Sequence, residues 1–130
     1  MKRAIQTHAA PAALGPYSQA IEQDGWIFCS GQIGLDAGSG QLVEGGIEAE
    51  TRRVMENLRE VLDAAGAGLR DVVKTTIFLS DLKDFEVVNR IYSEHFERPY
   101  PARSTVQAAA LPRGARVEIE AIARRPDRAL

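Results

Sequence analysis

Cysteine is almost absent from this sequence, and the spacing of its histidines does not suggest a metal site. Cys29 is the single cysteine in 130 residues, which excludes an internal disulfide and is typical of a reducing compartment, so we expect a cytoplasmic location. His8 and His95 are far apart, and neither a His-x-x-x-His nor a Cys-x-x-Cys pair occurs. No internal metal site is therefore predicted.

Long apolar runs and a dominant charge are also absent. The apolar runs span only a few residues, whereas a membrane helix needs roughly 20. The first eight residues lack the apolar core of a signal peptide, so export is not expected. Sixteen basic and eighteen acidic side chains give a formal charge of −2 without a basic block. Neither nucleic acid nor an anionic membrane is therefore expected as a partner.

The length allows one hydrophobic core and is too short for two, so residues 1–130 are expected to form a single domain.

Aromatic residues are few, which argues against Glu118 and Glu120 as a glycosidase pair, because sugar clefts are lined with aromatics. The glycine-rich stretch Asp36–Gly40 lacks the Lys-Ser/Thr of a phosphate-binding loop and is interpreted as a turn.

Hydrophobic periodicity predicts two helices and five strands. Apolar residues at three- and four-residue spacing indicate a helix over Ile47–Ala65 and a second one that starts at Asp84, runs towards Phe96 and cannot continue past Pro99. Alternation and β-branched residues indicate strands at Gln19–Glu22, Trp26–Ser30, Val72–Leu79, Arg103–Ala108 and Val117–Ala123. The first two strands are joined by an Asp-Gly hairpin turn.

This order of elements predicts an α+β fold, with a mixed sheet that carries both helices on one side. In the last strand, Val117 and Ile119 face one side, whereas Glu118 and Glu120 face the other. The second face also contains Ile122, and such a mixture of polar and apolar residues favours a homo-oligomer that covers it.

Arg103 and the glutamates of the last strand are the candidates for chemistry. A guanidinium can bind the carboxylate of a small organic acid, and a neighbouring glutamate can transfer protons to and from water. Together they suit a hydrolytic reaction of such an acid. Without further information, purely structural roles are the more common ones for such residues: a salt-bridged surface arginine, and a glutamate that is half-solvated or paired with an arginine of another subunit. Cys29, in the apolar stretch Trp26–Cys29, is interpreted as a buried inert thiol rather than a nucleophile.

Six motifs occur in a fixed order between about Ile5 and Arg125, and their combination is typical of one protein family. They are Gly15-Pro16-Tyr17-Ser18-Gln19-Ala20, Ser30-Gly31-Gln32-Ile33, Val73–Leu79, Asp84-Phe85 with Val88-Asn89 and Tyr92, Pro101-Ala102-Arg103-Ser104, and Val117–Ala121. With these motifs the chain closely resembles the RidA family, also called YjgF.

The resemblance implies a chorismate-mutase-like fold that assembles as a homotrimer with three clefts between subunits. It implies hydrolysis of reactive enamine and imine intermediates, such as 2-aminoacrylate, to a 2-keto acid and ammonia, without a cofactor. The alternative is a trimer that binds 2-keto acids or acts like a chaperone without turnover. Ribonuclease activity, known for some relatives, conflicts with the negative charge.

The same resemblance assigns roles to individual residues. Arg103 would hold the substrate carboxylate, and Glu118 would activate the attacking water. The cleft would be lined by the Tyr17 ring and approached by the backbone of Ser30 and Gly31, with Thr105 in the place of a cysteine that many relatives carry. A backbone amide near Gly31 or Thr105 would stabilise the tetrahedral intermediate. Asn89 is expected only to cap or brace the second helix.

Overall fold

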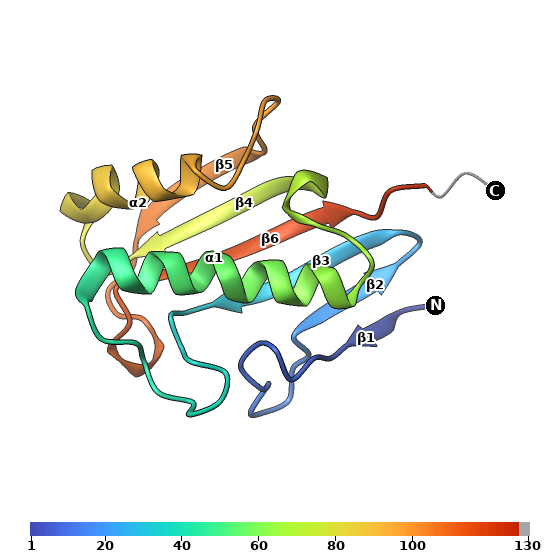
Figure 1. The fold of residues 1–130 in the computed structure, drawn as a ribbon, viewed down its shortest axis with the longest axis horizontal. Helices are drawn as coiled ribbons and strands as arrows, with labels where there is room; N and C mark the ends of the chain where they lie inside the picture. The colour runs from blue at the N-terminus through green and yellow to red at the C-terminus, as the bar shows by residue number, and fades with distance from the viewer. Residues whose placement is uncertain (128–130) are drawn as a thin grey trace.

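The computed structural model describes residues 1–127 as a six-stranded sheet with two α-helices on one face (Figure 1). The α-helices are α1 (Gly46–Ala64) and α2 (Phe85–Ser93), and the strands are β1 (Arg3–Ile5), β2 (Ala20–Gln23), β3 (Trp26–Gln32), β4 (Val72–Leu79), β5 (Ala102–Gln107) and β6 (Val117–Arg124). Short 3-10 turns occupy η1 (Leu69–Asp71), η2 (Leu82–Asp84) and η3 (Pro112–Gly114).

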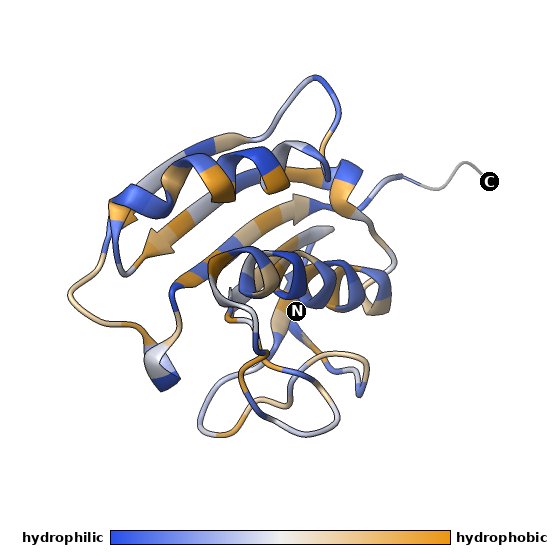
Figure 2. Cartoon of the chain, turned by 60° about the vertical axis from the view of Figure 1, so that its left-hand side comes forward, coloured by the Kyte–Doolittle hydropathy of each residue, from blue (hydrophilic) through white to orange (hydrophobic). Residues whose placement is uncertain are grey.

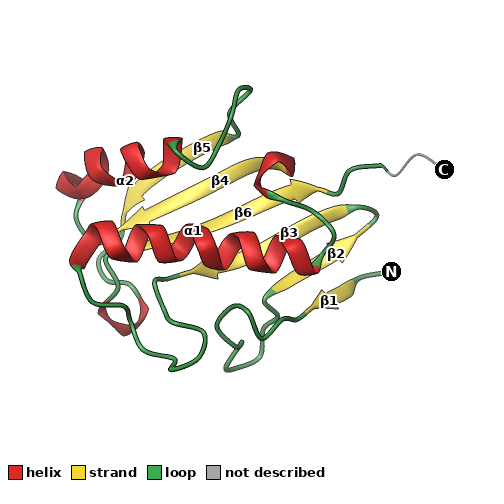
Figure 3. Cartoon of the chain, viewed as in Figure 1, coloured by secondary structure: helices red, strands yellow, loops and turns green. Residues whose placement is uncertain are grey.

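The strand order across the sheet is β1-β2-β3-β6-β4-β5, in which β4 and β5 run parallel and the other neighbours run antiparallel (Figure 3). This confirms the predicted α+β class and the mixed sheet with both helices on one side. The short strand β1 was not predicted, because three residues carry too little alternation to stand out in sequence.

The helices form where the apolar spacing predicts them. In α1 the stripe of Val54, Leu58 and Val61 is buried against the sheet, and Gly66, with φ of 80°, follows its end. Figure 2 shows hydrophobic and hydrophilic residues interspersed along both helices, as an amphipathic pattern requires. The predicted boundaries of α1 agree with the structure to within one residue.

The second helix is shorter than predicted. It ends at Ser93, and Phe96 is buried in the segment beyond it. Asp84 occupies the N-cap position but its side chain makes no capping hydrogen bond. Asp81 caps the preceding turn instead, because its carboxylate accepts a hydrogen bond from the Lys83 N–H at 3.0 Å.

The two faces of the sheet differ in composition. On β6, Val117 and Ile119 are completely buried towards the helices, whereas Glu118 and Glu120 point to the open face, as predicted. Large apolar side chains share that open face, where Phe28 is 48% exposed and Val106 is 44% exposed. Exposed apolar area on a sheet face is the pattern expected of a surface that another protein covers.

Among residues 1–127, no helix is long and apolar enough to cross a membrane.

Candidate functional site

Glu118 lies beside an irregularity in the neighbouring strand β3. Cys29 pairs with Ala121 and Gln32 pairs with Ile119, so two residues of β3, Ser30 and Gly31, lie opposite one residue of β6. This is a β-bulge, a feature that is frequent next to active sites. A Cβ at Gly31 would come within 2.9 Å of the Glu118 carboxyl carbon, so only glycine leaves the carboxylate room to lie against the bulge.

Four of the six predicted site residues line one cavity of about 490 Å³. They are Tyr17, Ser30, Gly31 and Glu118. The cavity has a volume that suits a small organic ligand. The structure thus brings together the loop that carries Tyr17, the bulge and Glu118, whereas Arg103 and Thr105 lie elsewhere.

The Glu118 carboxyl is partly buried in this cavity. Its burial, and secondarily the negative charge of Glu120, raise its pKa above the ordinary value. A carboxyl with a raised pKa exchanges protons closer to neutral pH, which suits general acid–base catalysis. Cys29, in contrast, is buried with its pKa raised to about 12, so the thiol is inert near neutral pH, as predicted.

Ser30 holds the local structure together through its hydroxyl. Its hydroxyl donates a hydrogen bond to the Ser18 carbonyl at 2.6 Å, and its N–H donates to the Gln19 carbonyl at 3.0 Å. Gln19, for which no role was predicted, is buried and accepts a hydrogen bond from the Thr7 N–H at 2.7 Å. Its amide also donates to backbone carbonyls, including that of Pro11 at 2.8 Å. These bonds hold the N-terminal loop, and with it Tyr17, against the sheet.

Arg103 is held on the other face of the sheet, beside α2. Its guanidinium Nη1 donates a hydrogen bond to Asn89 Oδ1 at 2.8 Å. The guanidinium carbon lies 5.0 Å from the centre of the Tyr92 ring and 5.5 Å from that of Phe85, within the range of cation–π attraction. The side chain is exposed, yet three contacts fix its direction, so it is not a freely solvated surface arginine.

Asn89 therefore has a different role from the predicted one. It neither caps nor braces α2 but orients the guanidinium of Arg103. Phe85, Asn89 and Tyr92 are spaced by four and three residues, which places them on one face of the helix. That spacing was the sequence feature that could have identified the three residues as one support for an arginine.

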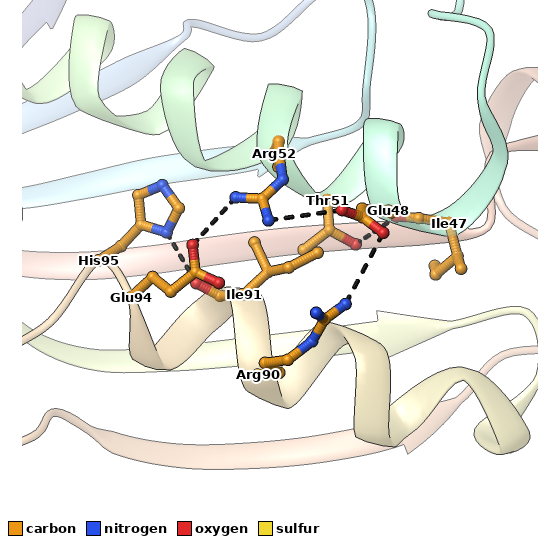
Figure 4. Close-up of polar contacts among 8 residues, drawn as sticks. All are labelled: Ile47, Glu48, Thr51, Arg52, Arg90, Ile91, Glu94 and His95. Carbon is orange, nitrogen blue, oxygen red and sulfur yellow. Dashed lines mark hydrogen bonds and ion pairs between the residues drawn. The ribbon is translucent and has the colours of Figure 1, made fainter.

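A chain of ion pairs across the outer surface links α2 to α1 (Figure 4). Arg52 of α1 lies 3.0 Å from Glu94 and 3.5 Å from Glu48, and Arg90 of α2 lies 3.7 Å from Glu48. Exposed pairs of this kind stabilise a fold only weakly. Ile91 and Tyr92, buried beneath them, provide the firmer attachment of α2 and so of the Arg103 support.

Within one chain, Arg103 and Glu118 lie on opposite faces of the sheet. Arg103 is in register with Thr75, whose hydroxyl is hydrogen-bonded to the Tyr92 hydroxyl at 2.7 Å on the helix side. Glu118 is in register with Phe78, an odd number of residues further along β4. Because side chains alternate between faces, a single chain does not place this guanidinium beside this carboxylate.

Thr105 lies on the same strand as Arg103 and faces the helix side with it, in register with Ile77. Its Oγ1 is buried and has no hydrogen-bond partner in the described part of the chain. The cavity that contains Arg103 has a volume of about 460 Å³ and is lined by Asn89, Tyr92 and Tyr100, among others. Thr105 is not among its lining residues.

Within residues 1–127, no group of three or more His, Cys, Asp and Glu side chains is placed to hold a metal ion.

Known proteins resemble this chain along nearly its whole length. Residues 7–125 match the family described as Endoribonuclease L-PSP. The 2-iminobutanoate/2-iminopropanoate deaminase of Mus musculus is 54% identical over 123 residues, which cover 95% of this chain and 91% of the mouse protein.

Solved structures agree with the sequence match. The crystal structure of RidA from an Antarctic Psychrobacter has a TM-score of 0.91 and 46% identity, and covers 94% of this chain and 98% of that one. The structure of Escherichia coli TdcF with bound serine has a TM-score of 0.89 and 38% identity, with 95% and 99% covered. The chain therefore belongs to the Endoribonuclease L-PSP family, which is the RidA (YjgF) family that its motifs resemble.

Proposed function

We propose that this protein is a 2-imino acid deaminase, which hydrolyses reactive enamine and imine intermediates, such as those from 2-aminoacrylate, to 2-keto acids and ammonia. The mouse relative carries the name of this activity at 54% identity. The structural observation that carries the proposal is the Glu118 carboxyl, which lies against the Gly31 bulge inside a cavity and has a raised pKa. A carboxyl in that setting can exchange a proton with a bound water.

The reaction requires orientation of the substrate and one activated water. Arg103 would pair with the substrate carboxylate through two parallel hydrogen bonds, which fix the plane of the adjoining C=N bond. Glu118 takes a proton from water while the water oxygen attacks the imine carbon, and the electron pair of the C=N bond moves to nitrogen. That proton passes to nitrogen and gives a carbinolamine, which carries one hydroxyl and one amino group. Glu118 then moves the hydroxyl proton to the amino nitrogen, the C–N bond breaks, and ammonia leaves as the C=O bond forms.

Other parts of the site would support these steps. The Tyr17 ring, which is 55% exposed, would cover the bound substrate. The backbone amides of Gly31 and Thr105 are the proposed donors to the oxygen of the carbinolamine intermediate. The hydrolysis consumes only water and the imine, and the proposal includes no cofactor.

The opposite placement of Arg103 and Glu118 implies that a complete site is shared between subunits. We propose a homotrimer of chorismate-mutase-like fold with three clefts, each formed by Arg103 of one subunit and Glu118 of another. The exposed Phe28 and Val106 on the open face support association of chains through that face. Such an arrangement would bring Arg103 and Glu118 into one cleft although a single chain carries them on opposite faces of its sheet.

The proposal extends to the whole chain and its location. We propose that residues 1–130 form one domain and that the protein acts in the cytoplasm on a small imino or keto acid, without nucleic acid or membrane as partner. The reduced state expected of the buried Cys29 and the net charge of −2 support this location and this choice of partner.

A second candidate function is binding of small carboxylates without turnover. TdcF, with serine bound, shows that one structural neighbour holds a small amino acid. Arg103 would serve both functions, whereas only hydrolysis requires Glu118. Tight binding of 2-keto acids by a protein that releases no ammonia would favour binding over catalysis, whereas full hydrolysis by a Glu118→Gln variant would remove Glu118 from the mechanism.

The test is a coupled assay in which a dehydratase generates 2-aminoacrylate and the release of ammonia and 2-keto acid is followed. We expect wild-type protein to accelerate the release, Arg103→Ala to abolish the acceleration, and Glu118→Gln to lower the rate about 10²–10⁴-fold. Arg59→Gln, at an exposed position of α1, is the matched control and should retain wild-type activity. A wild-type protein that gives no acceleration would reject the proposed function.

A further inference from the structure

The cavity that contains Glu118 also contains a cation that the mechanism does not use. Among the described residues that line it, Arg113 is the one basic side chain and Glu118 is the one carboxylate. Arg113 lies in η3, the turn that leads from β5 into β6.

The backbone holds Arg113 in an unusual conformation. Its φ of 61° and ψ of 18° lie in the left-handed region, which residues with a side chain seldom adopt. Gly114, the next residue, also has a positive φ, of 72°. Such conformations persist where the surrounding structure imposes them, and they are frequent at ligand sites. The turn therefore fixes the direction in which the arginine side chain leaves the backbone.

The side chain is tethered, yet its charge is not neutralised. Arg113 Nη2 donates a hydrogen bond to the carbonyl oxygen of Gly40 at 2.8 Å. A guanidinium has five N–H donors, so this bond leaves most of them available. Arg113 takes part in none of the ion pairs found within residues 1–127.

The two opposite charges on the cavity wall do not satisfy each other. Glu118 forms no ion pair with Arg113, and both influences on its carboxyl, burial and the nearby Glu120, raise its pKa rather than lower it. Apolar side chains, including Leu14 and Ile33, also line the space. The cavity can therefore accept a short methylene chain with a negative group at its end, because the guanidinium offsets the repulsion from the glutamates.

We propose that Arg113 is a specificity-determining residue that binds a second carboxylate on the side chain of the substrate. The site then accepts dicarboxylic 2-imino acids, such as 2-iminosuccinate and 2-iminoglutarate, as well as 2-iminobutanoate. This inference rests on the proposed function, since Arg103 of a neighbouring subunit holds the carboxylate next to the imine.

Calorimetry with two stable keto acids of equal carbon number tests the binding step. 2-Ketoglutarate carries the second carboxylate, and 2-ketopentanoate has a methyl group at the same end. We expect Arg113→Gln to weaken binding of 2-ketoglutarate about tenfold or more and to change that of 2-ketopentanoate less than about threefold. Arg113→Gly should show the same selective loss without strain in the turn, because glycine tolerates a positive φ. Arg59→Gln is again the control with an arginine removed from an exposed surface.

The activity arm uses 2-iminoglutarate and 2-iminobutanoate, each generated in the assay by an amino acid oxidase. The inference predicts hydrolysis of both by wild-type protein and a selective fall in kcat/KM for 2-iminoglutarate in the two Arg113 variants. Hydrolysis of 2-iminobutanoate alone, or an equal effect of Arg113→Gln on both ligands in both assays, overturns the inference and leaves the deaminase proposal standing. Failure on both imines overturns the deaminase proposal itself, whatever calorimetry shows for the keto acids.

Discussion

Two inactive variants of this protein should restore each other when their subunits are mixed. Arg103→Ala removes the carboxylate anchor, and Glu118→Gln removes the base, so each variant alone should have little activity. Because the two residues lie on opposite faces of one sheet, each cleft would take them from different chains. With random assembly of equal amounts, about one quarter of the clefts receive an intact Arg103 together with an intact Glu118.

The experiment co-expresses the two variants in equal amounts with different affinity tags, and a pull-down through one tag verifies that mixed oligomers form. Activity is measured on the whole mixture, without selection for oligomers that carry both tags. Ammonia release from 2-iminobutanoate is then compared with that of wild-type protein. A second mixture, of wild-type chains with the Arg103→Ala/Glu118→Gln double variant, provides a matched measurement. There, a shared cleft predicts about one quarter of wild-type activity, whereas a site within one chain predicts about one half. Mixed oligomers of the single variants that remain inactive would refute the shared cleft.

Three further predictions concern single residues. Asn89→Ala should raise KM about tenfold with a smaller effect on kcat, because Arg103 loses the acceptor that orients it. Asn89→Asp keeps an acceptor oxygen and should recover much of the loss. Equal KM values for wild-type protein and Asn89→Ala in steady-state kinetics would contradict this role. Gly31→Ala should lower kcat at least about tenfold, since the added methyl group displaces the Glu118 carboxylate, while the circular dichroism spectrum stays unchanged. A wild-type kcat in this variant would show that the close approach of Gly31 to Glu118 is unimportant. Glu118 must be ionised to accept a proton, and its pKa is raised, so kcat/KM should fall as the pH drops through that raised pKa. If the Glu118→Gln variant shows the same fall in kcat/KM at low pH, the titrating group is not Glu118.

The pattern within each element was predictable from sequence because it is local. The spacing of Val54, Leu58 and Val61 defines the buried side of α1, and the alternation on β6 separates Ile119 from Glu118. These features depend on residues a few positions apart, and the hydrophobic effect sorts them in the same way wherever the element packs.

The relation between strands was not predictable in the same way. Whether Arg103 and Glu118 share a face depends on how β5, β4 and β6 align, and a shift of one residue in either pairing reverses the answer. The contact between Arg103 and Asn89 likewise depends on where α2 lies over the edge of the sheet. The family resemblance could name candidate site residues, but it could not show that one chain separates Arg103 from Glu118.

The extra residue in β3 also makes this strand sensitive to changes in length. Cys29 and Gln32 both point towards the interior although they are three positions apart, and only the bulge makes that possible. Deleting either Ser30 or Gly31 would restore regular pairing and remove the bulge against which the Glu118 carboxylate lies, while a deletion in the loop after β3 would leave the bulge intact. An insertion or deletion at this one point would therefore displace the Glu118 carboxylate from the bulge while the other strand pairings of the sheet remain.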